Sequence, residues 1–229
     1  MQAPAADVVH PLPNGDVVEV RFSTKGHGDF HIDRDRDVLR ARRARFVDVP
    51  WTQLDEVHGT TVREVRHCGE HDFAEGDALF TDLPGAVLGL WVGDCAPVAL
   101  IHASGRIGAV HAGWRGAAQG VLEATVTAMG GGTMDAYLGP CIHPCCYEFG
   151  ETELDAMVAR FGERVAATTS HGHPALDMRA VVDAALSPLG VTVHDVSVCT
   201  GCARDWYFSH RVRAETGRHV MTVQRVAQA

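Results

Sequence analysis

Residues 87–114, VLGLWVGDCAPVALIHASGRIGAVHAGW, form the stretch that decides how the middle of this chain folds. The stretch contains three short apolar runs that predict β-strands: residues 87–92, 97–102 and 107–111. Ser104-Gly105 is a turn signal, which favours an antiparallel hairpin between the second run and the third. Because Cys95 precedes one hairpin strand and His111 ends its partner, we expect both side chains at the same end of the sheet.

A third candidate metal ligand, His58, lies upstream of this stretch. Two histidines and one cysteine can hold Zn²⁺ and leave its fourth position free for water or substrate, which is typical of catalytic zinc. If Glu56 and His58 share an extended strand, their side chains point to the same face. Glu56 could then orient a metal-bound histidine or act as a base on a metal-bound water, and a surface glutamate fits the pattern equally well.

Gly113, Trp114 and Arg115 come directly before a predicted helix over residues 117–129. Free N–H groups at a helix start, together with a guanidinium group, make a site for an anion. A phosphate or a carboxylate could therefore bind close to His111. The alternative is that Arg115 pairs with a structural carboxylate.

The bulk composition excludes several classes of protein. The chain has 229 residues and a net charge of -9, which argues against nucleic-acid binding and against docking on anionic membranes. Its longest uncharged apolar run, residues 83–93, is too short to cross a bilayer, and we see no signal peptide. No repeat, linker or shift in composition divides the chain. We therefore expect a single domain over residues 1–229 in the cytoplasm, with residues 1–15 as a loose lead-in.

The chain contains seven cysteines, for which metal binding or plain burial is favoured over a disulfide framework. Cys141, His143, Cys145 and Cys146 lie close together in the sequence, which by itself suggests a second metal centre. Their spacing is not that of a known zinc finger, however, and we favour a role for Cys141 in lining the main pocket. Residues 199–202, CTGC, have the C-x-x-C spacing of half a structural zinc site, without an evident second half.

Taken in order along the chain, a set of motifs resembles the multicopper polyphenol oxidase (laccase-domain) family, now generally regarded as purine nucleoside phosphorylases. The motifs are His58-Gly59-Thr60, Asp77-Ala78-Leu79, Gly93-Asp94-Cys95-Ala96-Pro97, His111-Ala112-Gly113-Trp114-Arg115-Gly116, Gly139-Pro140-Cys141-Ile142, Tyr147-Glu148, Cys199-Thr200, Ser209-His210-Arg211 and Thr216-Gly217-Arg218. The resemblance implies an α+β fold of one domain, with mixed β-sheets in a sandwich flanked by helices. It also implies a zinc ion on His58, Cys95 and His111.

The activity that the resemblance implies is phosphorolysis of adenosine, inosine or guanosine to the base and ribose 1-phosphate. Adenosine deamination and methylthioadenosine phosphorolysis accompany it in similar proteins. A zinc-bound water of lowered pKa would suit deamination. For the phosphate, Arg115 is the first candidate and Arg211 the second. Glu56 or Asp94 could handle the proton at the purine.

The expected site also includes further groups from the same motifs: Cys141 among the catalytic residues, and Gly113, Trp114 and Ser209 among those that bind substrate or phosphate. We expect a monomer whose partners are the nucleoside and phosphate alone.

The sequence departs from the pattern of similar proteins at several points. Glu56 stands where glutamine is usual, which places a charge near the metal. Gly93 stands where alanine is usual, a minor change. Val212-Arg213 replaces a charged pair often found near Arg211. The N-terminal part is short, with residues 23–28 in place of familiar elements, so part of the pocket could be truncated.

Three other functions compete with phosphorolysis. The first is copper-dependent phenol oxidation, although multicopper centres need many more histidines in set patterns than we can place. The second is a non-catalytic metal-binding protein, which a fourth protein ligand such as Cys141 would favour. The third is a hydrolase that uses Cys95 as the nucleophile and His111 as the base. A metal held by both residues would exclude this last role.

Overall fold

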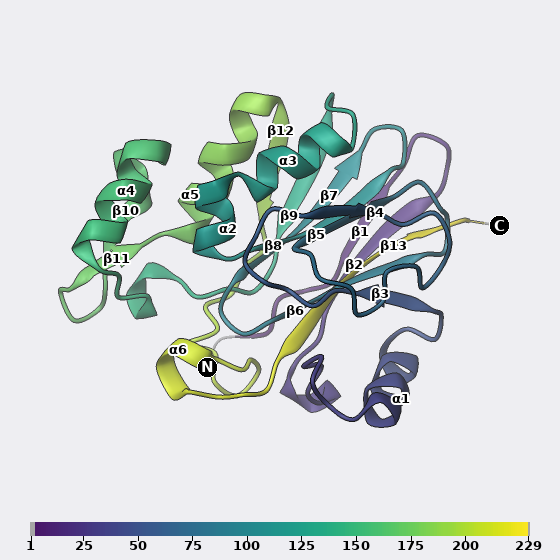
Figure 1. Cartoon of the computed structure of the whole chain (residues 1–229), viewed down its shortest axis with the longest axis horizontal. Helices are drawn as coiled ribbons and strands as arrows, with labels where there is room; N and C mark the ends of the chain where they lie inside the picture. Colours follow the sequence, from purple (N-terminus) through teal and green to yellow (C-terminus); the bar gives the residue numbers. More distant parts are fainter. Residues whose placement is uncertain (1–2, 229) are drawn as a thin grey trace.

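The computed structural model describes residues 3–228, in which two large β-sheets pack face to face, with helices on both outer sides (Figure 1). Two further short strands form a separate two-stranded sheet. The five-stranded sheet has the order β1 (Val8–Pro11), β2 (Val17–Phe22), β13 (His219–Val226), β6 (Val87–Val92), β3 (Trp51–Gln53). The six-stranded sheet has the order β12 (Val191–Asp195), β9 (Met134–Leu138), β7 (Ala96–His102), β8 (Ile107–Ala112), β5 (Ala78–Thr81), β4 (Val62–Glu64). Both sheets are mixed, because β3–β6, β4–β5 and β9–β12 pair in parallel.

The helices divide between the two outer faces (Figure 1). Helix α1 (Arg36–Phe46) covers the five-stranded sheet, and the other side carries α2 (Trp114–Gln119), α3 (Val121–Ala128), α4 (Glu151–Phe161) and α5 (Met178–Leu186). The remaining short elements are α6 (His210–Arg213), β10 (Ala166–Thr168), β11 (Pro174–Leu176) and the 3₁₀ helices η1 (Lys25–His27), η2 (Pro144–Cys146), η3 (Glu163–Val165) and η4 (Ser187–Leu189). Within residues 3–228, no helix has the length and apolar character needed to cross a membrane.

The central strands are apolar on both faces because each sheet is covered on both sides. Leu88 and Leu90 of β6 pack between the sheets, whereas Val87 faces α1. In β7, Ala99 and Ile101 pack between the sheets, and Val98 and Leu100 face the helices. This layering confirms the predicted α+β sandwich of mixed sheets flanked by helices.

The predicted hairpin is confirmed in detail. Strands β7 and β8 are antiparallel, and Pro97 lies opposite His111. Gly105 closes the turn with φ +89°, a conformation that glycine adopts without steric cost. Cys95 directly precedes β7, so it lies at the same end of the sheet as His111.

The N-terminal prediction was wrong: residues 1–15 are not a loose lead-in over the part that the structure describes. Val8–Pro11 forms an edge strand that pairs with β2, and Leu12 is buried between the sheets. The N–H of Ala5 donates to the hydroxyl of Tyr207 at 2.8 Å. The strand forms a local hairpin with β2, and Asn14-Gly15 in the connecting turn is the hairpin signal that the proline- and alanine-rich composition concealed. Residues 1 and 2 of this prediction lie outside the described residues.

Two other element predictions need correction. The strand predicted over residues 57–65 begins only at Val62, and His58 lies in a tight loop with φ +61°. Glu56 and His58 therefore do not share a strand face. The helix predicted over residues 117–129 starts earlier and breaks at Gly120, which has φ +98° and separates α2 from α3.

His219 of β13 is a buried group whose burial makes stability depend on pH. Burial lowers the pKa of His219 to about 3, so the folded state leaves the imidazole neutral where the unfolded chain would protonate it. Stability is therefore lost as the pH falls below the unfolded value of about 6.5, by up to about 1.4 kcal/mol per pH unit.

We expect His219→Phe to flatten this part of the pH profile, because phenylalanine keeps the ring that packs against Tyr207. The measurement is the free energy of urea unfolding between pH 5 and pH 8. His171→Phe, at an exposed loop position, is the matched control and should keep the profile of the natural chain. Parallel profiles for the natural chain and the His219 variant would contradict this account.

Candidate active site

Three separate segments bring His58, Cys95 and His111 together. Their ligand atoms all lie within 4.8 Å of one another, and the Sγ of Cys95 is 3.7 Å from the Nε2 of His58. His58 comes from the loop before β4, Cys95 from the turn between β6 and β7, and His111 from β8. The structure thus assembles the predicted set of ligands, although not through the predicted strand at residues 57–65.

A buried carboxylate, Asp77, orients this cluster. Its Oδ1 lies 2.9 Å from the Nδ1 of His111, which leaves the Nε2 of that ring free for a metal. The N–H groups of His58 and Gly59 donate to the same carboxylate at 2.8 and 2.7 Å. Burial opposes ionisation, but these hydrogen bonds and His111 keep the pKa of Asp77 below its ordinary value. Metal-binding histidines commonly have such a partner. The sequence signal was the carboxylate directly before an apolar strand, to which no role was assigned.

Gly113 and Gly116 allow helix α2 to begin close to the His58 loop. A Cβ at Gly113 would lie 2.6 Å from the Cδ2 of His58, and one at Gly116 would lie 2.8 Å from the carbonyl oxygen of Gly59. Gly113 does not line the cavity, so its predicted contact with substrate is not seen. Its geometry instead makes room for a metal ligand.

The cluster is buried and electrostatically coupled. Burial raises the pKa of Glu56 to about 8, and its Oε2 lies 3.7 Å from the Nε2 of His111. Burial opposes ionisation of Cys95 as well, but His111 and His58 lower the pKa of this thiol to about 6. Burial lowers the pKa of His111, but the negative charges of Glu56 and Cys95 outweigh this effect and raise that pKa above its ordinary value. A thiolate and two imidazoles, one of them oriented by a carboxylate, form a donor set that suits zinc.

The ligand cluster opens into a cavity of about 410 Å³, a size typical of sites for small molecules. The aromatic lining comprises Trp91, Trp114 and Tyr147, and the cationic lining comprises Arg115, Arg211 and Arg218. Glu56 and Asp94 also line it. One cavity therefore combines flat apolar surfaces, positive charge and a set of metal ligands.

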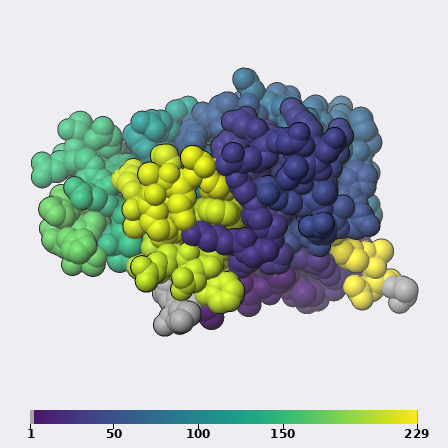
Figure 2. Space-filling model, turned by 90° about the horizontal axis from the view of Figure 1, so that it is seen from below, coloured from purple at the N-terminus to yellow at the C-terminus, as the bar shows by residue number. Residues whose placement is uncertain are grey.

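Asp94 lines the cavity, but its carboxylate is already occupied by three donors. These are the hydroxyl of Thr200 at 2.5 Å, the hydroxyl of Ser209 at 3.1 Å and the N–H of Arg211 at 2.7 Å. Asp94 has φ +107°, a conformation that side-chain-bearing residues rarely adopt, and these bonds support it. The geometry favours a positioning role for Asp94, which ties the turn before β7 to residues 199–213, called the C-terminal segment below. In Figure 2 that segment (yellow) lies between the helical end (green) and the N-terminal part (dark purple).

Two predicted site residues do not reach the cavity. Ser209 is fully buried, and its hydroxyl caps α6 while donating to Asp94. Cys141 is also fully buried; it pairs with Cys199 in a short parallel bridge and does not line the cavity. Cys141 does not belong to the group of ligand atoms formed by His58, Cys95 and His111, so the structure does not support it as a nucleophile or as a fourth ligand there. Burial also raises the pKa of its thiol well above the ordinary value.

The sequence reasoning missed several cavity residues, among them Trp91, Tyr147 and Arg218. The motif at residues 216–218 was recognised, but Arg218 was not assigned a role in the site. A Cβ at Gly93 would lie 2.8 Å from the Cδ of Arg218, whose guanidinium lies 5.9 Å from the ring of Trp91. The glycine at this position is therefore more than a minor change, because it makes room for Arg218.

Replacing Asp77 by asparagine should weaken metal binding at this cluster about 10- to 100-fold. The variant keeps the size of the side chain but removes the charge that orients His111. The measurement is the dissociation constant for zinc at the His58, Cys95 and His111 cluster, by competition with a chromogenic chelator. Asp82→Asn is the control, since its carboxylate pairs with Arg106 at the surface. Equal affinities for both variants would exclude an orienting role for Asp77.

The chain is similar to several known proteins over most of its length. It is 34% identical over 222 residues to the purine nucleoside phosphorylase PA4543 of Pseudomonas aeruginosa, covering 92% of this chain and 89% of that one. It is 33% identical to the purine nucleoside phosphorylase YlmD of Geobacillus stearothermophilus, covering 85% and 81%. The purine nucleoside phosphorylase YfiH of Escherichia coli is 32% identical, covering 84% and 80%.

Solved structures share the fold. Protein NMB0706 of Neisseria meningitidis superimposes with a TM-score of 0.80 at 25% identity, covering 96% of this chain and 99% of that one. YlmD of Geobacillus stearothermophilus gives 0.78 at 25% identity, covering 97% and 100%. The family model for multi-copper polyphenol oxidoreductase laccase matches residues 14–225. The chain therefore belongs to the multi-copper polyphenol oxidoreductase laccase family.

Proposed function

We propose that the chain is a zinc-dependent purine nucleoside phosphorylase, which converts adenosine, inosine or guanosine and phosphate to the free base and ribose 1-phosphate. The observation that carries the proposal is the single cavity where an incomplete metal-ligand set, aromatic rings and arginines meet. The names of the relatives from three bacteria point the same way.

The aromatic lining suits a flat purine base. Trp114 lies edge-on to Phe149, with ring centroids 5.3 Å apart, and Tyr147 contacts Phe149 at the same centroid distance. These contacts hold the rings of Trp114 and Tyr147 in place before a ligand arrives. A planar heterocycle gains both apolar burial and favourable ring contacts from such surfaces.

Arg115 is the first candidate for the phosphate. It is exposed, its guanidinium lies 4.5 Å from the ring of Trp114, and no salt bridge engages it among the described residues. Arg211 is the second candidate, because its Nη1 already donates to the carbonyl of Glu148 at 2.6 Å. Helix α2 has only 6 residues, so we base the phosphate seat on the guanidinium group and not on the helix start.

The proposed reaction is a displacement at C1′ of the ribose. A phosphate oxygen forms a bond to C1′ while the bond from C1′ to the purine nitrogen breaks, and its electron pair leaves with the base, which takes up a proton. A zinc ion on His58, Cys95 and His111 would supply Lewis-acid stabilisation of negative charge in the cavity. Because Asp94 is occupied by three donors, Glu56 is the remaining candidate for carrying the proton. The Oε1 of Glu56 accepts the N–H of Trp91 at 2.9 Å, which fixes the carboxyl group.

Copper-dependent phenol oxidation is the second candidate function, and one observation favours it. Two histidines and one cysteine with a weak methionine ligand also form a blue-copper set, and Met178 lines the same cavity. A multicopper centre needs further histidines, and among residues 3–228 this cluster is the only group of potential metal ligands that contains a histidine. Metal identity therefore separates the two candidates.

The first experiment measures nucleoside phosphorolysis and phenol oxidation on one preparation of the protein. We expect inosine to release hypoxanthine only when phosphate is present, with ribose 1-phosphate as the second product. Chelation should abolish the activity, and zinc should restore it better than copper. With adenosine, the ratio of adenine to inosine tests whether deamination occurs as well, and methylthioadenosine tests the remaining predicted substrate. Phenol oxidation after copper loading, without nucleoside cleavage, would overturn the proposal.

Arg115→Ala should raise KM for phosphate about 10- to 100-fold, the effect of losing charge-assisted hydrogen bonds worth about 1.5–3 kcal/mol. KM for inosine should change little, and Arg115→Lys should recover part of the phosphate affinity. Steady-state kinetics with each substrate varied in turn measures this. Arg40→Ala, on the exposed side of α1, is the control. An unchanged KM for phosphate would remove Arg115 from this role and leave Arg211 to be tested next.

A further inference from the structure

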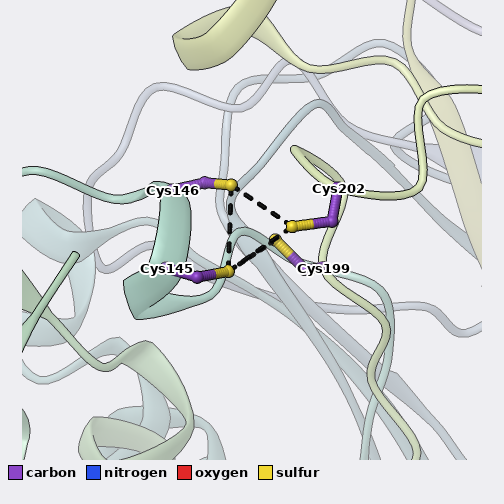
Figure 3. Close-up of side chains that lie close together, drawn as sticks. All are labelled: Cys145, Cys146, Cys199 and Cys202. Carbon is purple, nitrogen blue, oxygen red and sulfur yellow. Dashed lines mark hydrogen bonds between the residues drawn. The ribbon is translucent and has the colours of Figure 1, made fainter. Parts of the chain in front are cut away.

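Four cysteines from two distant parts of the chain, none of which lines the cavity, lie side by side (Figure 3). Cys145 and Cys146 are on the 3₁₀ helix η2, and Cys199 and Cys202 belong to the turn that follows β12. The Sγ of Cys145 lies 3.8 Å from Cys146, 3.6 Å from Cys199 and 3.5 Å from Cys202. Cys146 and Cys202 are also 3.5 Å apart, and all four sulfurs lie within 4.8 Å of one another.

We propose that these four thiolates bind one tetrahedral metal ion of the zinc class. Four sulfurs at about 2.3 Å from a zinc ion lie about 3.8 Å from each other, close to the distances observed. Disulfides would bring sulfurs to about 2.05 Å in pairs and would not require all four to converge on one point. A cluster of several iron atoms needs its cysteines farther apart, because the irons and their sulfides occupy the centre. The geometry therefore fits a single ion.

The backbone around the cysteines is arranged to hold this cluster. The N–H of His143 donates to the Sγ of Cys199 at 3.4 Å, a contact typical of metal-bound thiolates. Gly201 permits the close approach of the two segments, because a Cβ there would lie 2.8 Å from the Cβ and 2.9 Å from the Sγ of Cys146. The guanidinium of Arg213 donates to the carbonyl of Gly201 at 2.8 Å and so fixes the turn from its other side.

The site has four protein ligands and is closed, so its role is structural and differs from that of the open His58, Cys95 and His111 cluster. It fastens two segments that build the cavity wall. Tyr147 directly follows Cys146, and the hydroxyl of Thr200 donates to Asp94. The guanidinium of Arg211, from the C-terminal segment, lies 4.7 Å from the ring of Tyr147. A metal ion on the four cysteines holds this pair of cavity residues together.

Metal stoichiometry tests the proposal on the full chain, purified with a reductant and saturated with zinc. We expect about two equivalents of zinc per natural chain. Cys95→Ala should bind about one, because it loses the thiolate of the cluster formed with His58 and His111. A double variant, Cys146→Ser with Cys202→Ser, should also keep about one equivalent, and Cys68→Ser, at an exposed cysteine elsewhere, should keep both. A single equivalent in the natural chain that is lost entirely in Cys95→Ala would overturn the proposal.

Two further measurements do not depend on the folding of the double variant. Cys95→Ala loaded with Co²⁺ should show the intense sulfur-to-metal absorption of a tetrathiolate site. In Cys95→Ala loaded with zinc instead, a mercurial reagent should release the zinc as the thiols react. Peptide mapping of a separate sample of Cys95→Ala, from which a chelator has removed the metal, should find the four thiols free of disulfides. An absent charge-transfer band, or a disulfide between any two of the four cysteines in reduced protein, would overturn the proposal.

Discussion

The buried carboxylate of Asp77 is the interaction on which the active centre depends. It accepts N–H groups from the His58 loop and lies within hydrogen-bond distance of the His111 ring, so it joins two metal ligands that are far apart in the sequence. Such a buried charge is stable only when donors surround it, and here the donors come from the His58 loop and the His111 ring. Loss of this carboxylate would disturb the loop and the ring orientation together.

A second buried carboxylate, directly before the ligand Cys95, performs a similar task for another part of the cavity wall. Asp94 holds the C-terminal segment through Thr200, Ser209 and the backbone of Arg211. The proposed tetrathiolate site fastens the same segment to the loop that carries Tyr147. The cavity is therefore built between a metal-ligand cluster set in the sheet and a wall of loops held by polar and sulfur groups. Loops of this kind need such supports because they bury little apolar surface of their own.

Local patterns predicted much of the fold and the metal cluster. The β7–β8 hairpin followed from apolar runs and a turn signal, and it placed Cys95 and His111 at one end of the sheet. The missed strand β1 had a local signal, because Asn14-Gly15 lies in the turn of its hairpin with β2. The metal-binding cysteines, in contrast, have remote partners. The C-x-x-C at residues 199–202 finds its second half in Cys145 and Cys146, more than fifty residues away. No local pattern carries information about such pairings.

What the sequence by itself determined was the set of chemical groups and the central β7–β8 hairpin, because apolar runs and turn residues act over short distances. It also determined the family, through motifs that keep their order along the chain. Only the tertiary structure decided how each group is used. Asp94 and Ser209 form hydrogen bonds that hold the C-terminal segment, and Cys141 is buried in the core. Asp77 supports the metal ligands. The physical reason is that burial and the supply of hydrogen-bond partners decide whether a polar side chain is free to react, and both arise only when distant segments pack together.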